Sequence, residues 1–186
     1  MSNLNAANGF TPLRHLTGGV IRANEYPIAN AQTGSMAAGD IVALNASGTV
    51  IRGTAGGVAL GVFYGIEYIE NDTGDVKFKK VWNNATTAKA DTPIKAYVYD
   101  DPYTVFKVQT AGTSAQADVG GCGDLVAGAG STTTGQSGFE LSGTVSNGTA
   151  SCKVLGVYDT PDNAIGEFAI MEVLINEHLL KDSAGI

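Results

Sequence analysis

The stretch Ile94-Lys-Ala-Tyr-Val-Tyr-Asp-Asp-Pro-Tyr-Thr-Val-Phe-Lys-Val108 carries the strongest strand pattern in the chain. Apolar and polar side chains alternate on both sides of Asp100-Asp101-Pro102, and β-branched and aromatic residues are common. A polar turn with proline between two alternating runs is typical of a hairpin. We therefore predict that the two halves of this stretch pair as a central hairpin. The side chains expected to face inward on its first strand are Ile94, Ala96 and Val98.

The composition around this stretch favours an all-β fold. The chain has 186 residues, of which 44% are hydrophobic, only 16% are charged and 25 are glycines. Few charges, many small residues and short apolar runs are typical of β proteins with many turns. We expect a compact antiparallel β-barrel or sandwich with an extended N-terminal arm and Gly/Thr-rich loops. The expected units are the arm with a first strand (1–30), a single β-barrel-like domain (31–180) and a tail (181–186).

Before the central stretch, the pattern predicts a series of short strands. Residues 39–44 and 49–52 flank an Asn-Ala-Ser-Gly turn, which predicts a hairpin. Residues 58–69 are expected to form a longer strand, and its glycines at 61 and 65 predict a bend or a bulge.

After the central stretch, the composition shifts toward small residues. Residues 127–138 are nearly all small, which predicts either a flexible loop or an exposed loop that a partner holds in place. Residues 139–142 and 150–158 are expected to pair, and residues 167–176 to form the last strand. A helix over 167–180 is the alternative, because Glu, Met and Leu favour helices.

The N-terminal segment Gly9–Gly19 has glycine at both ends, an internal proline and no helical periodicity. Its apolar side chains, Phe10, Leu13 and Leu16, need a surface to cover them. Such an arm packs either on its own domain or on a neighbouring chain, and the sequence leaves both alternatives open.

Charge argues against several classes of partner. The net charge is −7 and the 11 basic residues are scattered, whereas binding to phosphates needs clustered Lys and Arg. We therefore expect no nucleic acid and no anionic membrane as a partner. No apolar run approaches the ~20 residues needed to span a bilayer, and the N-terminus lacks the basic and apolar regions of a signal peptide. We expect Cys122 and Cys152 to be small buried thiols, since nothing marks the protein as secreted.

The sequence offers no case for an enzyme. The adjacent acids Asp100 and Asp101 precede a proline, so a role in a turn is favoured over acid–base catalysis. The histidines His15 and His178 lie far apart, and no activated nucleophile or phosphate-binding loop is found. We predict no catalytic residue, no cofactor and no metal.

Three segments resemble virion structural proteins that tailed bacteriophages encode beside their major capsid protein. The segments are Gly9-Phe-Thr-Pro-Leu-Arg-His-Leu-Thr-Gly-Gly19, Ala96-Tyr-Val-Tyr-Asp-Asp-Pro102 with Phe106-Lys-Val-Gln109, and Met171-Glu-Val-Leu-Ile-Asn-Glu-His178. In addition, Gly39–Leu44, Gly48–Val50 and Leu60–Val62 are similar in style to small β-barrel capsid decoration proteins.

These resemblances imply a capsid decoration, or cement, protein. Such a protein binds the major capsid protein on the outer capsid surface and bridges neighbouring subunits; it is made in the host cytoplasm and resides in the virion. A homo-oligomer is expected, with a trimer favoured. The residues expected to contact capsid protein or sister copies are Phe10, Pro12, Leu13, Arg14, His15, Leu16, Thr132, Thr133 and Thr134.

Two other classes of virion protein stay open. One is a head-fibre or receptor-binding module for host glycans, for which Trp82-Asn-Asn84 and Tyr99-Asp-Asp101 would supply aromatic rings beside polar groups. The other is a head–tail connector or a tail component. A glycan depolymerase is the least favoured alternative.

Overall fold

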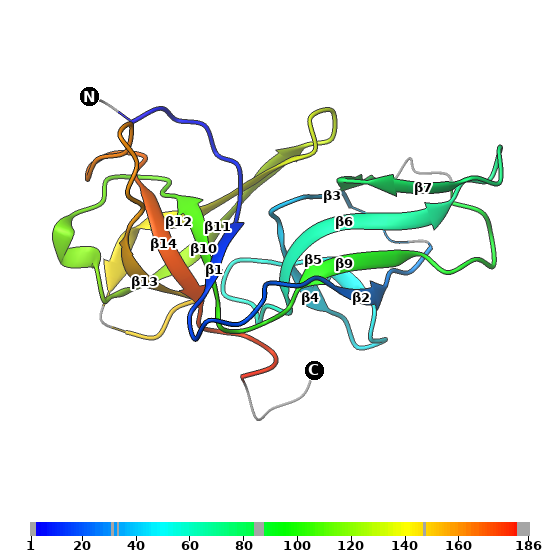
Figure 1. The fold of residues 1–186 in the computed structure, drawn as a ribbon, viewed down its shortest axis with the longest axis horizontal. Coiled ribbons are helices and arrows are strands. Elements are labelled where there is room, and N and C mark those ends of the chain that lie inside the picture. The colour runs from blue at the N-terminus through cyan, green and yellow to red at the C-terminus, as the bar shows by residue number, and fades with distance from the viewer. Residues whose placement is uncertain (1–2, 31, 33, 84–87, 147, 182–186) are drawn as a thin grey trace.

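The computed structural model describes residues 3–30, 32, 34–83, 88–146 and 148–181. As predicted, the fold is all-β, with antiparallel sheets packed together in a sandwich-like arrangement. Two six-stranded sheets and one two-stranded sheet make up the described part (Figure 1). A 3₁₀ turn at Gln116–Asp118 is the helical element assigned there.

Sheet A has the strand order β1-β10-β14-β13-β11-β12. Phe106, Phe139 and Met171 are among its core side chains and are at most 1% exposed. The sheet curls so far that the Ala111 N–H donates to the Leu141 carbonyl, but the described strands do not close into a barrel. Its strands are β1 (Thr11–His15), β10 (Thr104–Gln109), β11 (Cys122–Ser131), β12 (Gln136–Ser146), β13 (Cys152–Val157) and β14 (Ile170–Ile175).

Sheet B has the order β2-β9-β6-β4-β5, and β7 pairs with the second half of β6. Its core is a separate cluster around Phe63, Tyr68 and Trp82. The strands are β2 (Asn24–Pro27), β4 (Ile41–Leu44), β5 (Val50–Arg52), β6 (Gly61–Ile69), β7 (Val76–Lys79) and β9 (Lys95–Tyr99), and the small sheet pairs β3 (Met36–Ala37) with β8 (Val81–Trp82).

The prediction of a central hairpin over residues 94–108 is wrong. Strand β9 pairs with β2 and β6 in sheet B, whereas β10 pairs with β1 and β14 in sheet A. Both strands are therefore interior strands of different sheets, and residues 100–103 are the crossing between them. The alternation was interpreted correctly, since Ala96 and Val98 are fully buried, but the partners of both strands lie far away in the sequence.

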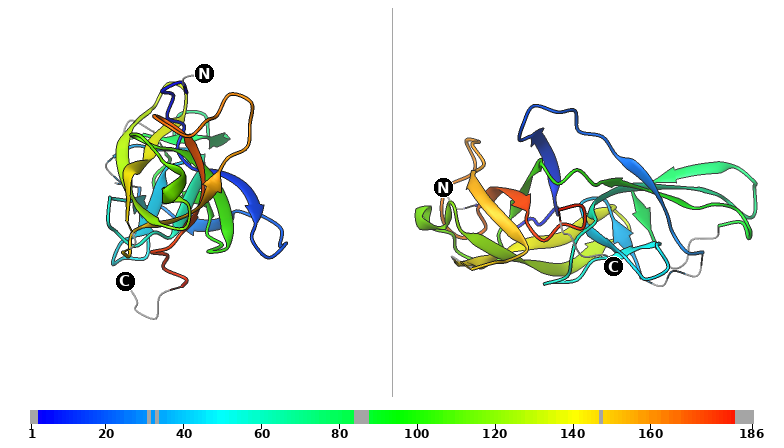
Figure 2. Two further views of the ribbon diagram at one scale, coloured as in Figure 1. Left: turned by 90° about the vertical axis from the view of Figure 1, so that its left-hand side faces the viewer. Right: turned by 90° about the horizontal axis from the view of Figure 1, so that it is seen from below.

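Sheet B is an insertion between two neighbouring strands of sheet A. The chain leaves sheet A after β1, builds sheet B and returns to β10, where His15 and Thr104 are directly paired. We call residues 24–99 lobe B, and residues 3–15 with 104–175 lobe A. The segments 16–23 and 100–103 are the two crossings. The lobes lie side by side along the long axis of the molecule (Figures 1 and 2).

The predicted flexible loop 127–138 is instead the end of a long hairpin of β11 and β12, with its turn at residues 132–135. Its small residues allow close approach of the two strands: a Cβ on Gly128 would lie 2.1 Å from the Gly138 carbonyl oxygen. The predicted pairing of 139–142 with 150–158 is also wrong, because β12 pairs with β11 and β13 pairs with β11 and β14.

Several local predictions are confirmed. Strands β4 and β5 form the predicted hairpin, β6 carries a register shift between Phe63 and Gly65, and β14 is a strand, so the helical alternative is wrong. Cys122 and Cys152 are buried and unpaired.

No described helix has the length and apolar character needed to cross a membrane. Strands β1 and β2, which lie in the predicted unit 1–30, are edge strands of the two main sheets.

Candidate functional site

Asp100 ties the second crossing to lobe B. Its carboxylate is 5% exposed and accepts hydrogen bonds from the Asn24 amide, at 2.9 Å to each oxygen, and from the Tyr26 hydroxyl at 2.6 Å. Burial, together with the hydrogen bond to Asp100, raises the pKa of Tyr26, so the phenol stays protonated and keeps donating. Asp100 is thus a structural acceptor for the strand that enters lobe B.

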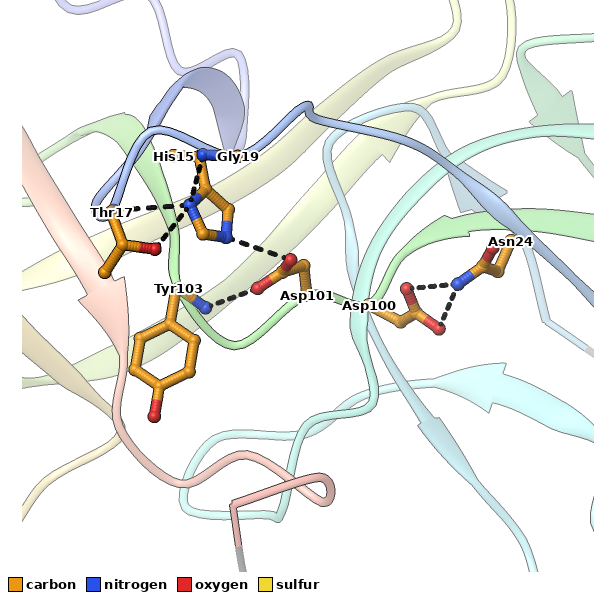
Figure 3. Close-up of polar contacts among 7 residues, drawn as sticks. All are labelled: His15, Thr17, Gly19, Asn24, Asp100, Asp101 and Tyr103. Atoms are coloured by element: carbon orange, nitrogen blue, oxygen red, sulfur yellow. Dashed lines mark hydrogen bonds and ion pairs between the residues drawn. The ribbon is translucent and has the colours of Figure 1, made fainter.

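Asp101 ties the same crossing to lobe A. One carboxylate oxygen lies 3.0 Å from His15 Nε2, and the other accepts the Tyr103 N–H at 2.8 Å. His15 Nδ1 accepts the Gly19 N–H at 3.0 Å, which assigns the ring proton to Nε2, facing Asp101. Figure 3 shows that the two aspartates point to different partners: Asp101 to His15 and Tyr103, and Asp100 to Asn24. Together they tie the second crossing to β1 and β2, the strands that flank the first crossing.

His178 lies in the C-terminal segment 176–181, which returns to lobe B: the Ala59 N–H donates to the Glu177 carbonyl, and the Leu179 N–H donates to the Ala59 carbonyl. Its side chain is 2% exposed. Burial, and then the Lys181 ammonium, lower the pKa of His178 to about 4. Within the described residues, His, Cys, Asp and Glu form no group of three or more that could hold a metal ion.

The residues at the start of the N-terminal arm are hydrogen-bonded to lobe A. The Ala6 N–H donates to Gln109 Oε1, and Gln109 Nε2 donates to the Leu4 carbonyl. Asn3 Nδ2 donates to the carbonyls of Ala164 and Glu167. The arm is therefore part of lobe A.

The expected contact residues lie in different environments. Phe10 is 2% exposed and packs edge-on against Phe106 in the core. Arg14 pairs with Glu172 at 2.6 Å. Pro12, Leu13 and His15 are half-buried, whereas Arg14, Leu16, Thr132, Thr133 and Thr134 are exposed.

One cleft brings the two predicted contact regions together. It has a volume of about 640 Å³, and Pro12 of the arm and Thr134 of the hairpin turn line it together with Tyr64 and Tyr99 of sheet B. The remaining lining residues are Asn8, Phe10, Thr11, Ala38, Gly39, Phe63, Lys80, Gly135 and Gln136. Residues from both lobes and from the arm therefore converge on a single hollow.

An aromatic row continues from this cleft along sheet B. Its ring centroids are 5.4 Å apart from Tyr99 to Tyr64, 5.9 Å from Tyr64 to Phe78 and 5.6 Å from Phe78 to Tyr97. Phe78 covers Gly65, where an added Cβ would lie 2.7 Å from the Phe78 ring. Even so, Tyr64 remains 41% exposed and Phe78 remains 50% exposed.

Sequence reasoning missed the aromatic row, although part of its signal was present. The alternation in residues 94–99 places Tyr97 and Tyr99 on one face, but nothing local indicates that Tyr64 and Phe78 join that face. Of the glycan-binding alternatives, Tyr99 lines the cleft, whereas Trp82 is 1% exposed and belongs to the core; Asn84 lies outside the described residues.

The cleft and the row offer ring faces, amides and hydroxyls, a chemistry of stacking and hydrogen bonding. Comparisons with protein families, with curated proteins and with solved structures find no match for this chain.

Proposed function

We propose that this chain is a non-enzymatic virion structural protein of a tailed bacteriophage, a capsid decoration protein that binds the outer surface of the major capsid shell and bridges neighbouring subunits. One structural observation adds to the sequence resemblance on which the proposal rests. The segments that resemble virion proteins lie on β1, β10 and β14, which are consecutive neighbours in sheet A, and on β9 of sheet B. The resemblance therefore covers three neighbouring strands of lobe A and extends through the second crossing into lobe B.

Two exposed elements supply the contacts in this proposal. The first is the hairpin turn, where Thr132, Thr133 and Thr134 are exposed. The second is the first crossing, where Leu16 is 48% exposed and Val20 is 84% exposed. The turn and the crossing lie at opposite sides of the view in Figure 1. Two separated contacts on one copy suit a bridge between two capsid subunits, because the second contact forms at high effective concentration.

The partner in this proposal is the major capsid protein, and the attached form is a homo-oligomer, with a trimer favoured. The direct test is to assemble capsids from the major capsid protein encoded beside this chain, add the chain and locate it by electron microscopy. We expect many copies at equivalent positions over the outer shell. Density only at a single vertex or along a tail would instead indicate a head fibre, a connector or a tail component.

Deleting the arm is not a clean test, because Phe10 lies in the core and β1 pairs with β10. A sharper variant is Leu16→Asp with Val20→Asp, which alters exposed side chains only. We expect capsid binding to weaken about tenfold or more, as for a hot-spot residue. The matched control is Val76→Asp on β7, where the side chain is 65% exposed. Equal binding by the crossing variant and this control would exclude the crossing as a contact.

A further inference from the structure

We propose that the cleft and the aromatic row together form a binding site for a neutral saccharide chain. This inference goes beyond capsid attachment; its residues differ from those of the first crossing and share only Thr134 with the hairpin turn. Tyr64 and Tyr99 belong both to the cleft lining and to the row, so the two features form one continuous surface.

The dimensions suit an oligosaccharide. The cleft volume of about 640 Å³ lies within the roughly 300–1,000 Å³ typical of small-molecule sites. Beyond the cleft, the row adds two further rings, Phe78 and Tyr97. A ligand with several similar units in series would occupy the cleft with one end and pass over these rings with the other.

The ring chemistry matches a sugar better than a nucleobase. The C–H face of a pyranose is apolar and packs on an aromatic ring, while its hydroxyls point outward at the edge. Successive rings of the row are tilted by 50°, 53° and 54° relative to one another. Neighbouring rings therefore face different directions, and they do not form the parallel stack that flat bases would need. The net charge of −7 also repels a phosphate backbone.

The polar groups around the cleft are suited to uncharged hydroxyls. Asn8, Thr11, Thr134 and Gln136 supply amides and hydroxyls that can both donate and accept. Lys80 is the only charged side chain among the lining residues. At the far end of the row, the Tyr97 hydroxyl donates to Glu67 at 3.1 Å. Glu25 and Lys95, which pair at 2.9 Å, lie beside the same hydroxyl, so this end of the row carries charges of both signs and suits a neutral glycan.

A peptide added as an extra strand fits this surface less well. The row lies on the face of the sheet, where the backbone of β9 is paired on one side with β2 and on the other with β6. Strand addition requires an open edge with unpaired N–H and C=O groups.

The cleft walls are already held in position. The Phe10 N–H donates to the Gly39 carbonyl at 2.9 Å, and the Ala38 N–H donates to the Lys80 carbonyl at 2.8 Å. Gly9, with φ +64°, passes Ser137 so closely that an added Cβ would lie 2.3 Å from Ser137 Cβ. A preformed site binds without a further ordering cost.

The experiment titrates the full chain with maltohexaose, cellohexaose, mannohexaose and chitohexaose, using saturation-transfer NMR and calorimetry. We expect at least one of them to bind with a Kd of about 1 mM or tighter. Tyr64→Ala, which removes the ring shared by the cleft and the row, should weaken that binding about tenfold. Tyr64→Phe, which keeps the ring, should stay within about twofold of the wild type.

The matched control is Tyr103→Ala at the crossing, since Tyr103 is 48% exposed and Tyr64 is 41% exposed. This variant should bind like the wild type. The fluorescence of Trp82, the single tryptophan, reports whether each variant is folded.

Several outcomes would overturn the proposal: no saturation transfer from any of the four sugars at about 10 mM, equal binding by Tyr64→Ala and the wild type, or tighter binding of an anionic hyaluronan oligosaccharide. Binding of a polyproline peptide without binding of any sugar would assign the site to a protein partner. Tyr64→Ala should still attach to capsids, so failure of this proposal is distinguishable from failure of the capsid assignment.

Discussion

Lobe A and lobe B are both antiparallel β structures, but they differ in how the chain builds them. Lobe B is one continuous stretch, and half of its pairings join strands close in sequence, such as β4 with β5 and β6 with β7. Lobe A is made of two stretches, and β1 pairs with β10 across the whole of residues 16–103. Closing such a long connection costs chain entropy before any contact rewards it. Pairing of β1 with the rest of lobe A is therefore favoured once residues 16–103 have folded.

The lobes also differ in what they expose. Lobe B exposes the rings of Tyr64 and Phe78, whereas the exposed large apolar side chains of lobe A in the described residues are aliphatic: Leu4, Val126 and Ile165. The cores nevertheless touch, because Ile41, Ala59 and Val62 of lobe B belong to the same cluster as the core of sheet A. Two separate sheets therefore need not unfold independently of each other.

The largest expected effect tests whether the lobes unfold together. Phe139 in lobe A is fully buried, and the Arg52 guanidinium of lobe B lies over its ring at 4.6 Å. We expect Phe139→Ala to lower the free energy of unfolding by about 3–5 kcal/mol, as is usual for a deleted core phenylalanine.

Because the cores are shared, urea unfolding of this variant should show the same midpoint by circular dichroism and by Trp82 fluorescence, which reports on lobe B. A Trp82 transition that stays at the wild-type midpoint while the circular dichroism shifts would break the comparison, since lobe B would then unfold independently.

The next effect concerns the crossing between the lobes. Asp100→Ala leaves the Asn24 amide and the Tyr26 hydroxyl without their acceptor. We expect a loss of about 2–3 kcal/mol, because partly buried donors lose a charged partner. Asp101→Ala should cost about 1 kcal/mol, since its side chain is 31% exposed.

Chemical denaturation of the two variants measures this difference. Equal losses would contradict our interpretation that Asp100, which is more deeply buried than Asp101, contributes more to stability. If either variant stayed folded but lost attachment to capsids, the turn itself would become a contact site.

The third expected effect depends on pH and involves the C-terminal segment. The pKa of His178 is about 4 in the folded protein and 6.5 in the unfolded chain, so between these values the unfolded chain binds more protons. The stabilising contribution is complete above pH 6.5 and is lost as the pH falls toward 4, by about 2–3 kcal/mol at most.

His178→Asn retains an acceptor for the Leu180 N–H, which bonds His178 Nδ1 in the wild type. Thermal unfolding between pH 4 and 7 should depend less steeply on pH in this variant than in the wild type. Identical pH dependence would show that protonation of His178 does not lower the stability of the protein.

The sequence predicted features that depend on local chemistry and failed where distant partners decide. The Asn-Ala-Ser-Gly turn between β4 and β5 and the bulge at Gly65 follow from turn and glycine preferences within a few residues. The 94–108 stretch obeys the same local rules for a hairpin, yet β6 and β14 pair with its halves instead. Local turn chemistry permits a hairpin without requiring one.

Composition misled for residues 127–138 for a different physical reason. Small residues are common both in flexible linkers and where two backbones approach closely. At Gly138 an added Cβ would lie 2.3 Å from the Ala129 carbonyl oxygen, so glycine is required by packing inside an ordered hairpin. The cleft could not be predicted either, because its lining residues come from the arm, the hairpin turn and sheet B, which are far apart in the sequence.

The direct pairing of His15 with Thr104 makes lobe B a replaceable cassette. Since these two residues face each other at the end of an antiparallel ladder, a short tight turn has the right geometry to join them after excision of residues 16–103. Such a minimal protein would need new apolar residues where Ile41, Ala59 and Val62 now cover the sheet A core. By the same geometry, a foreign domain whose termini lie close together could be inserted at this junction in place of lobe B.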